Sequence, residues 1–426
     1  MCNDYKSSPT LTICTFSANT AYYFGGGMEN RFSSPTLNNC TFSGNTAEYY
    51  YYASGGGMYN ISCSPTLAIC TFSGNSAKYA GGAMFNDVDG NPILNNCTFS
   101  GNSANTDGGG MENWENSSPT IIDCTFSGNS ADRCGGGMLN RRLSDPNIVN
   151  CTFYANSASD SGGGIYNIFT DPDITNCTLS GNLAVNGGGI YNKHSGTMVT
   201  NCIFTGNSAS DSGGGMHNYH SDPKLTNCTF SGNSADYGGG ISDYNDSYLR
   251  VANCILWDNT TLSAGPQIYN DGTSWMMVRY SDVQDGGFNS HFGNIDEDPL
   301  FVDANGPDDI PGTEDDNLHL KSYSPCIDKG DPSGYHIWPM DMDGQQRLAY
   351  DTVDMGADEV FPVAGDFEPD GDVDAVDLGF FTGHWLADCI EPAWCDGCDI
   401  DMTGEVDFGD FTRLTAHWLK GTKWQF

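Results

Sequence analysis

One block of sequence returns along most of the chain, and this periodicity constrains the fold more than any other feature. GGGMENRFSSPTLNNCTFSGNTA begins at Gly25, and variants of it begin at Gly55, Gly81, Gly108, Gly135, Gly162, Gly187, Gly213 and Gly238. Each carries a glycine-rich triplet, Met or Ile, a polar residue two positions later, and then a Cys-containing and a Gly-Asn-containing stretch. A period of this length is typical of solenoids, in which each repeat buries its apolar face only against its neighbours.

The residues inside one block predict short strands separated by bends. Met28 and Asn30 are two positions apart, so they share one face of a strand, whereas Glu29 faces the other way. Leu37 and Cys40 are three positions apart, which breaks the strand period of two. Asn tolerates the left-handed conformation, so a tight turn at the intervening Asn pair restores the inward direction. We expect about three short strands in each block.

Stacking the blocks in register places like residues above one another at roughly 4.8 Å. The inward ladders are then formed by Cys14, Cys40, Cys70, Cys97, Cys124, Cys151, Cys177, Cys202, Cys228 and Cys254, and by Phe16, Phe42, Phe72, Phe99, Phe126, Phe153, Phe204 and Phe230. A turn ladder follows from Asn19, Asn45, Asn75, Asn102, Asn129, Asn156, Asn182, Asn207, Asn233 and Asn259, whose amides can bond along the axis. We interpret the cysteines as small buried apolar residues rather than as disulfides or metal ligands.

These repeats resemble the right-handed parallel β-helix of the pectate-lyase-like class. The nearest variety is the Gly-Gly-x-Ile/Met…Phe-x-x-Asn repeat of polymorphic outer-membrane proteins and bacterial surface β-helix proteins. The resemblance covers residues 1–265 and implies a mainly β solenoid of about ten coils. Met1 aligns with Met28, so we expect the chain to begin part-way round a coil.

The charge of the chain limits its partners. The 54 acidic and 16 basic residues give a net charge of −38, which repels phosphate and makes nucleic acid and anionic membranes poor partners. No stretch is apolar for long enough to span a membrane. Together with the β-helix resemblance, this composition favours a secreted or cell-surface protein.

Aromatic side chains recur at the position between the two inward residues of the first strand, and we predict that they form an exposed ligand-binding face suited to sugars. The candidates are Tyr59, Phe85, Tyr166, Tyr191 and His217, with Trp114 in a nearby turn. The alternative is that these rings only stabilise the sheet through cross-strand pairs. His194 and His220 occupy equivalent places in adjacent coils, and we interpret them as surface histidines.

No catalytic residue can be assigned from the sequence. Glu29 and Glu112 lie three coils apart, roughly 14 Å at the strand spacing, which is too far for the paired carboxyls of a glycosidase. The Arg-rich calcium site of pectin-type lyases has no counterpart that we can recognise.

Residues 266–362 are expected to cap the solenoid and so protect its last open edge. PQIYNDGTSWMMVRYSDVQDGG, GNIDEDPLFVD, SYSPCIDKGD and VDMGADEV resemble the C-terminal region of bacterial surface β-helix proteins of the "choice-of-anchor" type. Within this region the stretch from Asp303 to Asn317 has six carboxylates. It is either a calcium loop or a solvated acidic loop.

Two similar acidic loops followed by apolar helices are predicted in residues 363–426. The first loop offers Asp366, Glu368, Asp370, Asp372, Asp374 and Asp377, and the second offers Asp399, Asp401, Thr403, Glu405, Asp407 and Asp410. Hard oxygen donors at this spacing around a central glycine are typical of EF-hand loops, so the sequence predicts Ca²⁺ as a cofactor. The helices place Leu378, Phe381 and Trp385, and then Phe411, Leu414 and Trp418, on one face.

This pair of loop–helix units resembles dockerin modules, which bind cohesin domains on a scaffold or cell surface. The resemblance implies a cohesin-like partner for residues 365–420. Thr403 departs from the pattern, as do the pairs Ala375-Val376 and Phe408-Gly409 at the recognition positions. Among the connector cysteines Cys389, Cys395 and Cys398 we favour one disulfide over zinc.

The sequence therefore predicts a secreted or surface-displayed β-helix that binds carbohydrate or another surface ligand and is attached to a partner by its calcium module. One alternative is a polysaccharide lyase or glycoside hydrolase delivered by its dockerin. The other is a structural surface spacer.

Overall fold

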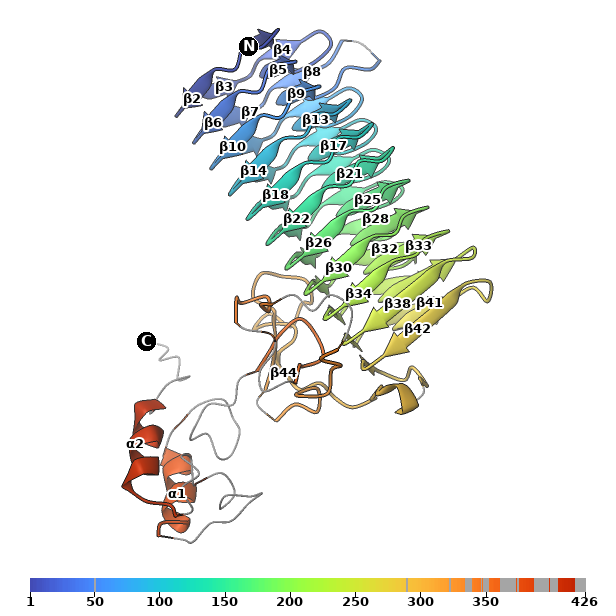
Figure 1. Cartoon of the computed structure of the whole chain (residues 1–426). Coiled ribbons are helices and arrows are strands. Elements are labelled where there is room, and N and C mark those ends of the chain that lie inside the picture. Colours follow the sequence, from blue (N-terminus) through green and yellow to red (C-terminus); the bar gives the residue numbers. More distant parts are fainter. Residues whose placement is uncertain are drawn as a thin grey trace.

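The computed structural model describes residues 1–49, 51–288, 290–321, 323–333, 339–345, 347, 352–360, 373, 375–386, 398 and 405–417. Residues 1–283 form a parallel β-solenoid in which each coil contributes one strand to each of up to four sheets (Figure 1). The mainly β class and the solenoid of about ten coils are therefore confirmed. We call the sheets A, B, C and D in the order in which the chain enters them.

The strand bounds are nearly the same in every coil. Sheet A contains β1 (Cys2–Asp4), β5 (Met28–Arg31), β9 (Met58–Ile61), β13 (Met84–Asp87), β17 (Met111–Trp114), β21 (Met138–Arg141), β25 (Ile165–Ile168), β29 (Ile190–Lys193), β33 (Met216–Tyr219), β37 (Ile241–Tyr244) and β41 (Ile268–Asn270). Sheet B contains β2 (Thr10–Thr12), β6 (Thr36–Asn38), β10 (Thr66–Ala68), β14 (Ile93–Asn95), β18 (Thr120–Ile122), β22 (Asn147–Val149), β26 (Asp173–Thr175), β30 (Met198–Thr200), β34 (Lys224–Thr226), β38 (Tyr248–Ala252) and β42 (Trp275–Arg279).

Sheets C and D complete each coil. Sheet C contains β3 (Thr15–Ser17), β7 (Thr41–Ser43), β11 (Thr71–Ser73), β15 (Thr98–Ser100), β19 (Thr125–Ser127), β23 (Thr152–Tyr154), β27 (Thr178–Ser180), β31 (Ile203–Thr205), β35 (Thr229–Ser231), β39 (Ile255–Trp257) and β43 (Asp282–Val283). Sheet D contains β4 (Thr20–Ala21), β8 (Thr46–Ala47), β12 (Ser76–Ala77), β16 (Ser103–Ala104), β20 (Ser130–Ala131), β24 (Ser157–Ala158), β28 (Leu183–Asn186), β32 (Ser208–Ser212), β36 (Ser234–Tyr237) and β40 (Thr260–Ala264). The expectation of three strands in each block was wrong by one, because the Ser-Ala pair after the turn asparagine forms its own short strand.

The turn between sheets B and C has the predicted left-handed geometry. Asn39 has φ 52°, and Asn96 in a later coil has φ 51°. The turn lets Leu37, at the middle of β6, and Phe42, at the middle of β7, both point inward, where each is fully buried. Residues 1–4 follow the same register, since Cys2 pairs with Glu29 and Asn3 with Asn30.

The interior consists of ladders of identical side chains. Phe99, Phe126 and Phe153 stack with ring centroids 4.6 and 4.8 Å apart. The ladder cysteines from Cys40 to Cys254 are buried free thiols. Stacked coils thus remove apolar surface from water that no single coil could bury alone, and the interpretation of the cysteines as small core residues is confirmed.

Two buried asparagine ladders run parallel to the axis. In the predicted turn ladder, each Nδ2 donates to the Oδ1 of the next asparagine at 2.8–3.0 Å. A second ladder, which we did not predict, begins at Asn3 and Asn30 in sheet A, with Nδ2–Oδ1 distances of 2.7–3.0 Å. Each amide both donates and accepts, so these polar groups are satisfied without water.

The second ladder ends on an acid rather than on an amide. Asp243 Oδ1 accepts from Asn218 Nδ2 at 2.8 Å, while the buried Oδ2 has no hydrogen-bond partner among the described residues. Burial raises the pKa of Asp243 to about 7. Because the unfolded carboxyl ionises near pH 4, stability is lost as pH rises from about 4 to 7.

We therefore predict that Asp243→Asn stabilises the solenoid by roughly 2–4 kcal/mol at pH 8 and by close to zero at pH 4. Urea unfolding at the two pH values measures this difference. Asp246→Asn, at an exposed acid of the same coil, should change little at either pH. An equal effect of Asp243→Asn at pH 4 and pH 8 would show that ionisation is not the cause.

The solenoid extends further than the boundary expected at residue 265. β41, β42 and β43 add another strand to sheets A, B and C. Ser281 replaces the ladder cysteine, since its Oγ accepts from Cys254 N at 3.1 Å. Below it, Asn294 Oδ1 accepts from Ser281 N, and Phe288 packs against the core. The described residues of 284–297, which include the 3₁₀ helix η1 (Ser290–Phe292), therefore lie against the last coil.

The described residues of 298–360, here called the flanking segment, lie beside the last coils rather than beyond them (Figure 1). The segment contains the antiparallel pair β44 (Phe301–Asp303) and β45 (Asn317–Leu320). Arg347, fully buried, pairs with Glu359 at 3.1 Å and donates to Asn201 Oδ1 of the solenoid at 3.2 Å. The expectation that the whole of 266–362 caps the end was therefore wrong, because much of it covers the outer face of sheet C.

Two short helices follow, α1 (Ala375–Gly383) and α2 (Phe408–His417). The two helices share one small apolar cluster, to which α1 contributes the buried Phe381 and α2 the buried Leu414. Its other buried members are Val373, Cys398 and Val406, and the partly buried Leu378, Trp385 and Phe411 pack against it. The predicted apolar faces are confirmed for these residues, whereas Trp418 lies outside the described residues. No helix in the described parts of the chain is long and apolar enough to cross a membrane.

Candidate functional site

The aromatic residues predicted to form an exposed face are largely covered. Tyr59, Phe85 and His217 are buried. The expectation was wrong because the chain folds back over sheet A just before each glycine triplet. Gly81 has φ 63°, and a Cβ there would lie 2.8 Å from Phe85 Cβ. Because Gly81 has no Cβ, its backbone can lie directly against Phe85, the outward-facing side chain of β13, and cover it.

The covered aromatic residues have partners of their own. Tyr59 donates from its hydroxyl to Asp87 Oδ2 at 2.5 Å and stacks on Phe24 at 4.4 Å. His217 Nδ1 lies 2.8 Å from Ser242 Oγ, and burial lowers the pKa of His217 to about 3. It is therefore neutral at pH 7. Tyr59, Phe85 and His217 stabilise the sheet rather than face a ligand.

The three remaining candidates are half-buried. Tyr166 and Tyr191 stack on each other with centroids 5.0 Å apart, which occupies the ring faces that a sugar would need. Trp114 lies beside two guanidinium groups, with Arg141 at 3.8 Å and Arg142 at 4.3 Å from the ring centroid. Arg141 also pairs with the buried Glu112. Burial raises the pKa of Glu112 to about 7 despite this pair.

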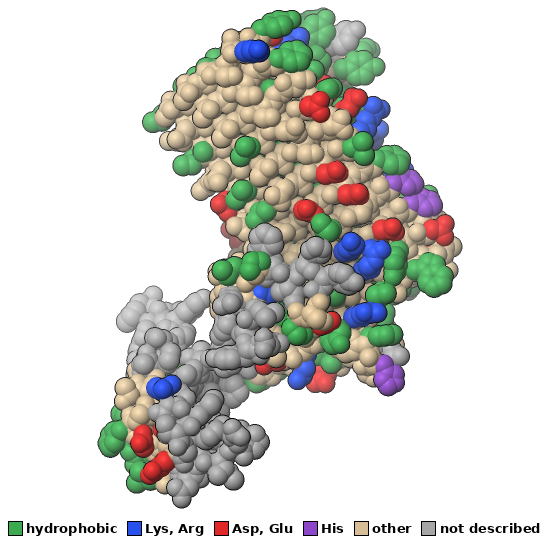
Figure 2. Space-filling view, in the orientation of Figure 1, with side chains coloured by type: hydrophobic (Ala, Val, Ile, Leu, Met, Phe, Trp, Pro, Cys, Tyr) green, Lys and Arg blue, Asp and Glu red, His purple; other side chains and the backbone are tan. Residues whose placement is uncertain are grey.

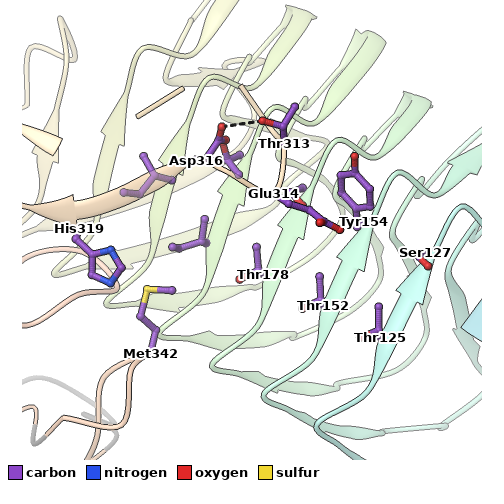
Figure 3. Close-up of a pocket in the computed structure, with 14 residues that line it drawn as sticks. Thr125, Ser127, Thr152, Tyr154, Thr178, Thr313, Glu314, Asp316, His319 and Met342 are labelled. Atoms are coloured by element: carbon purple, nitrogen blue, oxygen red, sulfur yellow. Dashed lines mark hydrogen bonds between the residues drawn. The ribbon is translucent and has the colours of Figure 1, made fainter. Parts of the chain in front are cut away.

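A groove lies instead where the open outer face of sheet C meets the flanking segment. Its volume is about 430 Å³. The floor carries two rows of side chains from β19, β23 and β27 (Figure 3). They are Thr125, Thr152 and Thr178 in one row, and Ser127, Tyr154 and Ser180 in the other. The register of sheet C places equivalent residues directly above one another, so the floor is a regular array of hydroxyls.

The wall of the groove comes from the flanking segment and includes Thr313, Glu314, Asp316, His319 and Met342. Asp316 Oδ2 accepts from Gly312 N at 2.6 Å and from Thr205 Oγ1 at 2.9 Å, which ties the wall to β31. Desolvation raises the pKa of Asp316. Glu314 is exposed and lines the groove together with Tyr154 (Figure 3).

Tyr154 is the one aromatic side chain on the groove floor. It takes the place that serine holds in most sheet C strands, and it is half-buried. No aromatic ring of the described residues stacks on it. Figure 3 shows the ring projecting from β23 into the groove, which leaves a flat apolar surface among hydroxyls.

One face of the solenoid carries few charged groups. On the face shown in Figure 2, backbone and neutral side chains predominate, and the acidic groups are scattered.

A family model described as "Right handed beta helix region" matches residues 28–170 and 164–287. Together the two matches span more than half of the chain. The chain belongs to the right-handed β-helix family. A search of curated proteins found no match.

The sequence of this β-helix protein contains a signal that predicts the position of the groove and that we did not recognise. The outer threonine of sheet C becomes Ile203 in β31 and Ile255 in β39. Ile203 packs with Leu318 and Ala357, and Ile255 packs with Leu320 and Met355. Apolar residues at a position otherwise held by threonine thus indicate where the flanking segment lies on the β-helix.

The predicted calcium loops fall mainly outside the described residues. Those outside are Asp366, Glu368, Asp370, Asp372, Asp374, Asp399, Asp401 and Thr403, and the side chain of Asp377 is also outside. Of the others, Glu405 and Asp407 are exposed, and the buried Asp410 accepts from Asp407 N at 2.9 Å. Cys398 is buried, and its Sγ lies 3.5 Å from His384 Nδ1. Cys389 and Cys395 lie outside the described residues, so the disulfide among the three cysteines stays a prediction.

The described residues contain one group of three side chains whose geometry could hold a metal ion: His319, Asp343 and Asp358. His194 and His220 stack 5.1 Å apart on the exposed surface without a third donor in the described structure. The described groove is lined by two carboxylates, Glu314 and Asp316, and Asp316 Oδ2 already accepts two hydrogen bonds.

Proposed function

We propose that this protein binds a polysaccharide chain in the groove between sheet C and the flanking segment. The observation that carries the proposal is the composition of the groove: rows of Thr and Ser hydroxyls on the floor, one aromatic ring at Tyr154, and carboxylates on the wall. Hydroxyls and carboxylates pair with sugar hydroxyls, and a flat ring packs on the apolar face of a sugar.

The shape and charge of the groove narrow the ligand class. The threonine row continues beyond the groove into strands of earlier coils, such as β15 and β11, so a long chain could lie along the solenoid axis. Glu314 and Asp316 on the wall repel anions. A neutral polysaccharide therefore fits better than a uronic-acid polymer.

Affinity electrophoresis of the full chain in gels containing neutral or acidic polysaccharides tests this proposal. We predict retardation by a neutral polysaccharide, and an affinity about tenfold weaker for Tyr154→Ala, because an aromatic anchor at the centre of a site typically contributes more than 1 kcal/mol. The matched control is Tyr49→Ala, at an exposed tyrosine that stacks on Tyr22 at 5.4 Å in the first coils. Equal loss in both variants, or loss in the control alone, would contradict a site in the groove.

Hydrolysis of the bound polysaccharide is a second candidate function, favoured by one observation. Glu314 and Asp316 both line the groove, and desolvation raises the pKa of Asp316 as a general acid requires. The hydrogen bonds that Asp316 accepts from Gly312 and Thr205 favour a structural role for it instead. Release of new reducing ends by the wild type, and its loss in Glu314→Gln, would establish a hydrolase.

The C-terminal residues support a further part of the proposal: a calcium-dependent module, similar to dockerins, that attaches the β-helix to a cohesin-like partner outside the cell. Two helices follow the two acidic loops, and their apolar faces share one small core. Oxygen donors such as Asp407 and Asp410 suit Ca²⁺. We propose that the ion orders each loop and that the helices present the partner surface.

A further inference from the structure

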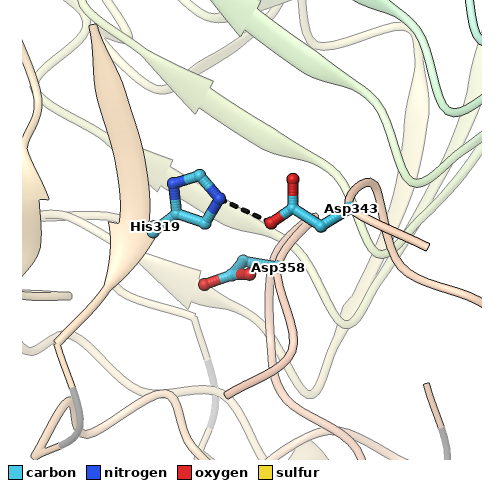
Figure 4. A group of neighbouring side chains, drawn as sticks. All are labelled: His319, Asp343 and Asp358. Carbon is cyan, nitrogen blue, oxygen red and sulfur yellow. Dashed lines mark hydrogen bonds and ion pairs between the residues drawn. The ribbon is translucent and has the colours of Figure 1, made fainter. Parts of the chain in front are cut away.

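Three side chains of the flanking segment converge at the wall of the groove. His319 comes from β45, Asp343 from the turn at 341–345, and Asp358 from the stretch 352–360. Their ligand atoms all lie within 4.8 Å of one another. Figure 4 shows the imidazole and the two carboxylates directed toward a common point.

The hydrogen bonds of Asn317 determine which nitrogen of His319 is free to bind. Asn317 Oδ1 accepts from His319 backbone N at 3.2 Å, which identifies this atom as the amide oxygen. The same oxygen lies 2.6 Å from His319 Nδ1. A carbonyl oxygen only accepts, so Nδ1 must carry the proton. In the neutral ring, Nε2 then presents its lone pair.

That lone pair faces a second acceptor. His319 Nε2 lies 2.6 Å from Asp343 Oδ2. Two lone pairs at this distance repel each other unless a positive charge lies on the ring or between the two atoms. Asp358 adds another carboxylate to the group, is 5% exposed, and is held in place because its Oδ2 accepts from Leu320 N at 3.0 Å.

The net charge of the three side chains indicates that a cation is missing from the cluster. With a neutral imidazole, the two carboxylates give a net charge of −2, and one of them is buried. A second proton on His319 compensates one charge, whereas a divalent cation compensates both and also engages Asp358. Burial of a carboxylate beside two further donors is therefore better explained by a metal ion than by a proton.

We propose that His319 Nε2, Asp343 and Asp358 bind a divalent transition-metal ion, with Zn²⁺ as the best fit. One imidazole nitrogen and two carboxylate oxygens suit zinc, while calcium and magnesium prefer all-oxygen sites. Asn317 acts as the outer partner that orients the ring. His319 also lines the groove, so a coordination position left open by three protein ligands is accessible from there.

Zn²⁺ alone is the probe, so the test does not depend on what the groove binds. Isothermal titration of the full chain, in excess Ca²⁺ to occupy the C-terminal loops, should detect one Zn²⁺ site. We expect His319→Ala and Asp343→Asn each to weaken that site at least tenfold. Asp343 is exposed, so its substitution should leave the fold intact, as circular dichroism can verify.

Two control variants test rival zinc ligands. His220→Ala removes half of the exposed histidine pair, and Cys2→Ser removes an exposed thiol. Both should bind Zn²⁺ as the wild type does. The proposal is overturned if the wild type binds no Zn²⁺, if affinity is unchanged in both His319→Ala and Asp343→Asn, or if binding is lost in either control.

Discussion

Asn129→Ala should destabilise the solenoid by about 4 kcal/mol, because the substitution leaves several buried polar groups unpaired. Asn129 Nδ2 donates to Phe99 O and to Asn156 Oδ1, both at 2.9 Å. Its Oδ1 accepts from the backbone N and the Nδ2 of Asn102 at 3.1 and 2.9 Å. Alanine replaces none of these bonds, and the site is too enclosed for water to reach it easily.

Urea unfolding followed by circular dichroism measures this loss. Asp132→Ala, at an exposed residue of the same coil, should change stability by less than about 0.5 kcal/mol. A similar small value for Asn129→Ala would mean that the amide ladders contribute little and that apolar packing alone holds the coils together. Because each coil contacts only its neighbours, the effect should be similar at equivalent asparagines of central coils.

Removal of Ca²⁺ should unfold the C-terminal module and leave the β-helix folded. The apolar cluster formed by the described residues of the module contains five buried residues, which is a small core for two loops and two helices. Metal binding in such a unit supplies folding free energy. The β-helix, in contrast, has a continuous core from Met28 to Val283.

Differential scanning calorimetry of the full chain with and without chelator tests this second prediction. The transition of the module should disappear or fall by roughly 10 °C or more, while the main transition stays in place. Added Ca²⁺ should restore the first transition. Identical melting curves under both conditions would refute the calcium proposal and, with it, the basis for a dockerin-like attachment.

The sequence predicted the solenoid well because its ladders are repeated in every coil. Met28, Leu37, Cys40 and Phe42 all point inward as expected, since strand alternation and a left-handed asparagine turn determine their directions locally. The last coil was not predicted because Ser281 and Val283 stand where other coils have the ladder Cys and Phe. Its register is maintained by hydrogen bonds to the previous coil, which no residue pattern reveals.

The candidate site was mislocated for a different reason. Strand alternation correctly directed Tyr59 and Phe85 away from the core, but it says nothing about what covers them. The backbone at Gly55 and Gly81 bends sharply and packs against the strand that carries these side chains. This is a tertiary contact, which strand alternation does not predict. The groove likewise depends on a segment more than one hundred residues away along the sequence. The only sequence signal for it is the change from Thr to Ile at Ile203 and Ile255.

The central claim is that a polysaccharide lies on sheet C beside the flanking segment. Hydroxyl-radical footprinting with and without the polysaccharide that the protein binds tests it most directly. The account predicts protection of Tyr154 and of residues 313–319, with no change at Tyr166 or Tyr191 on sheet A. Protection of Tyr166 and Tyr191, with Tyr154 left equally reactive, would contradict it.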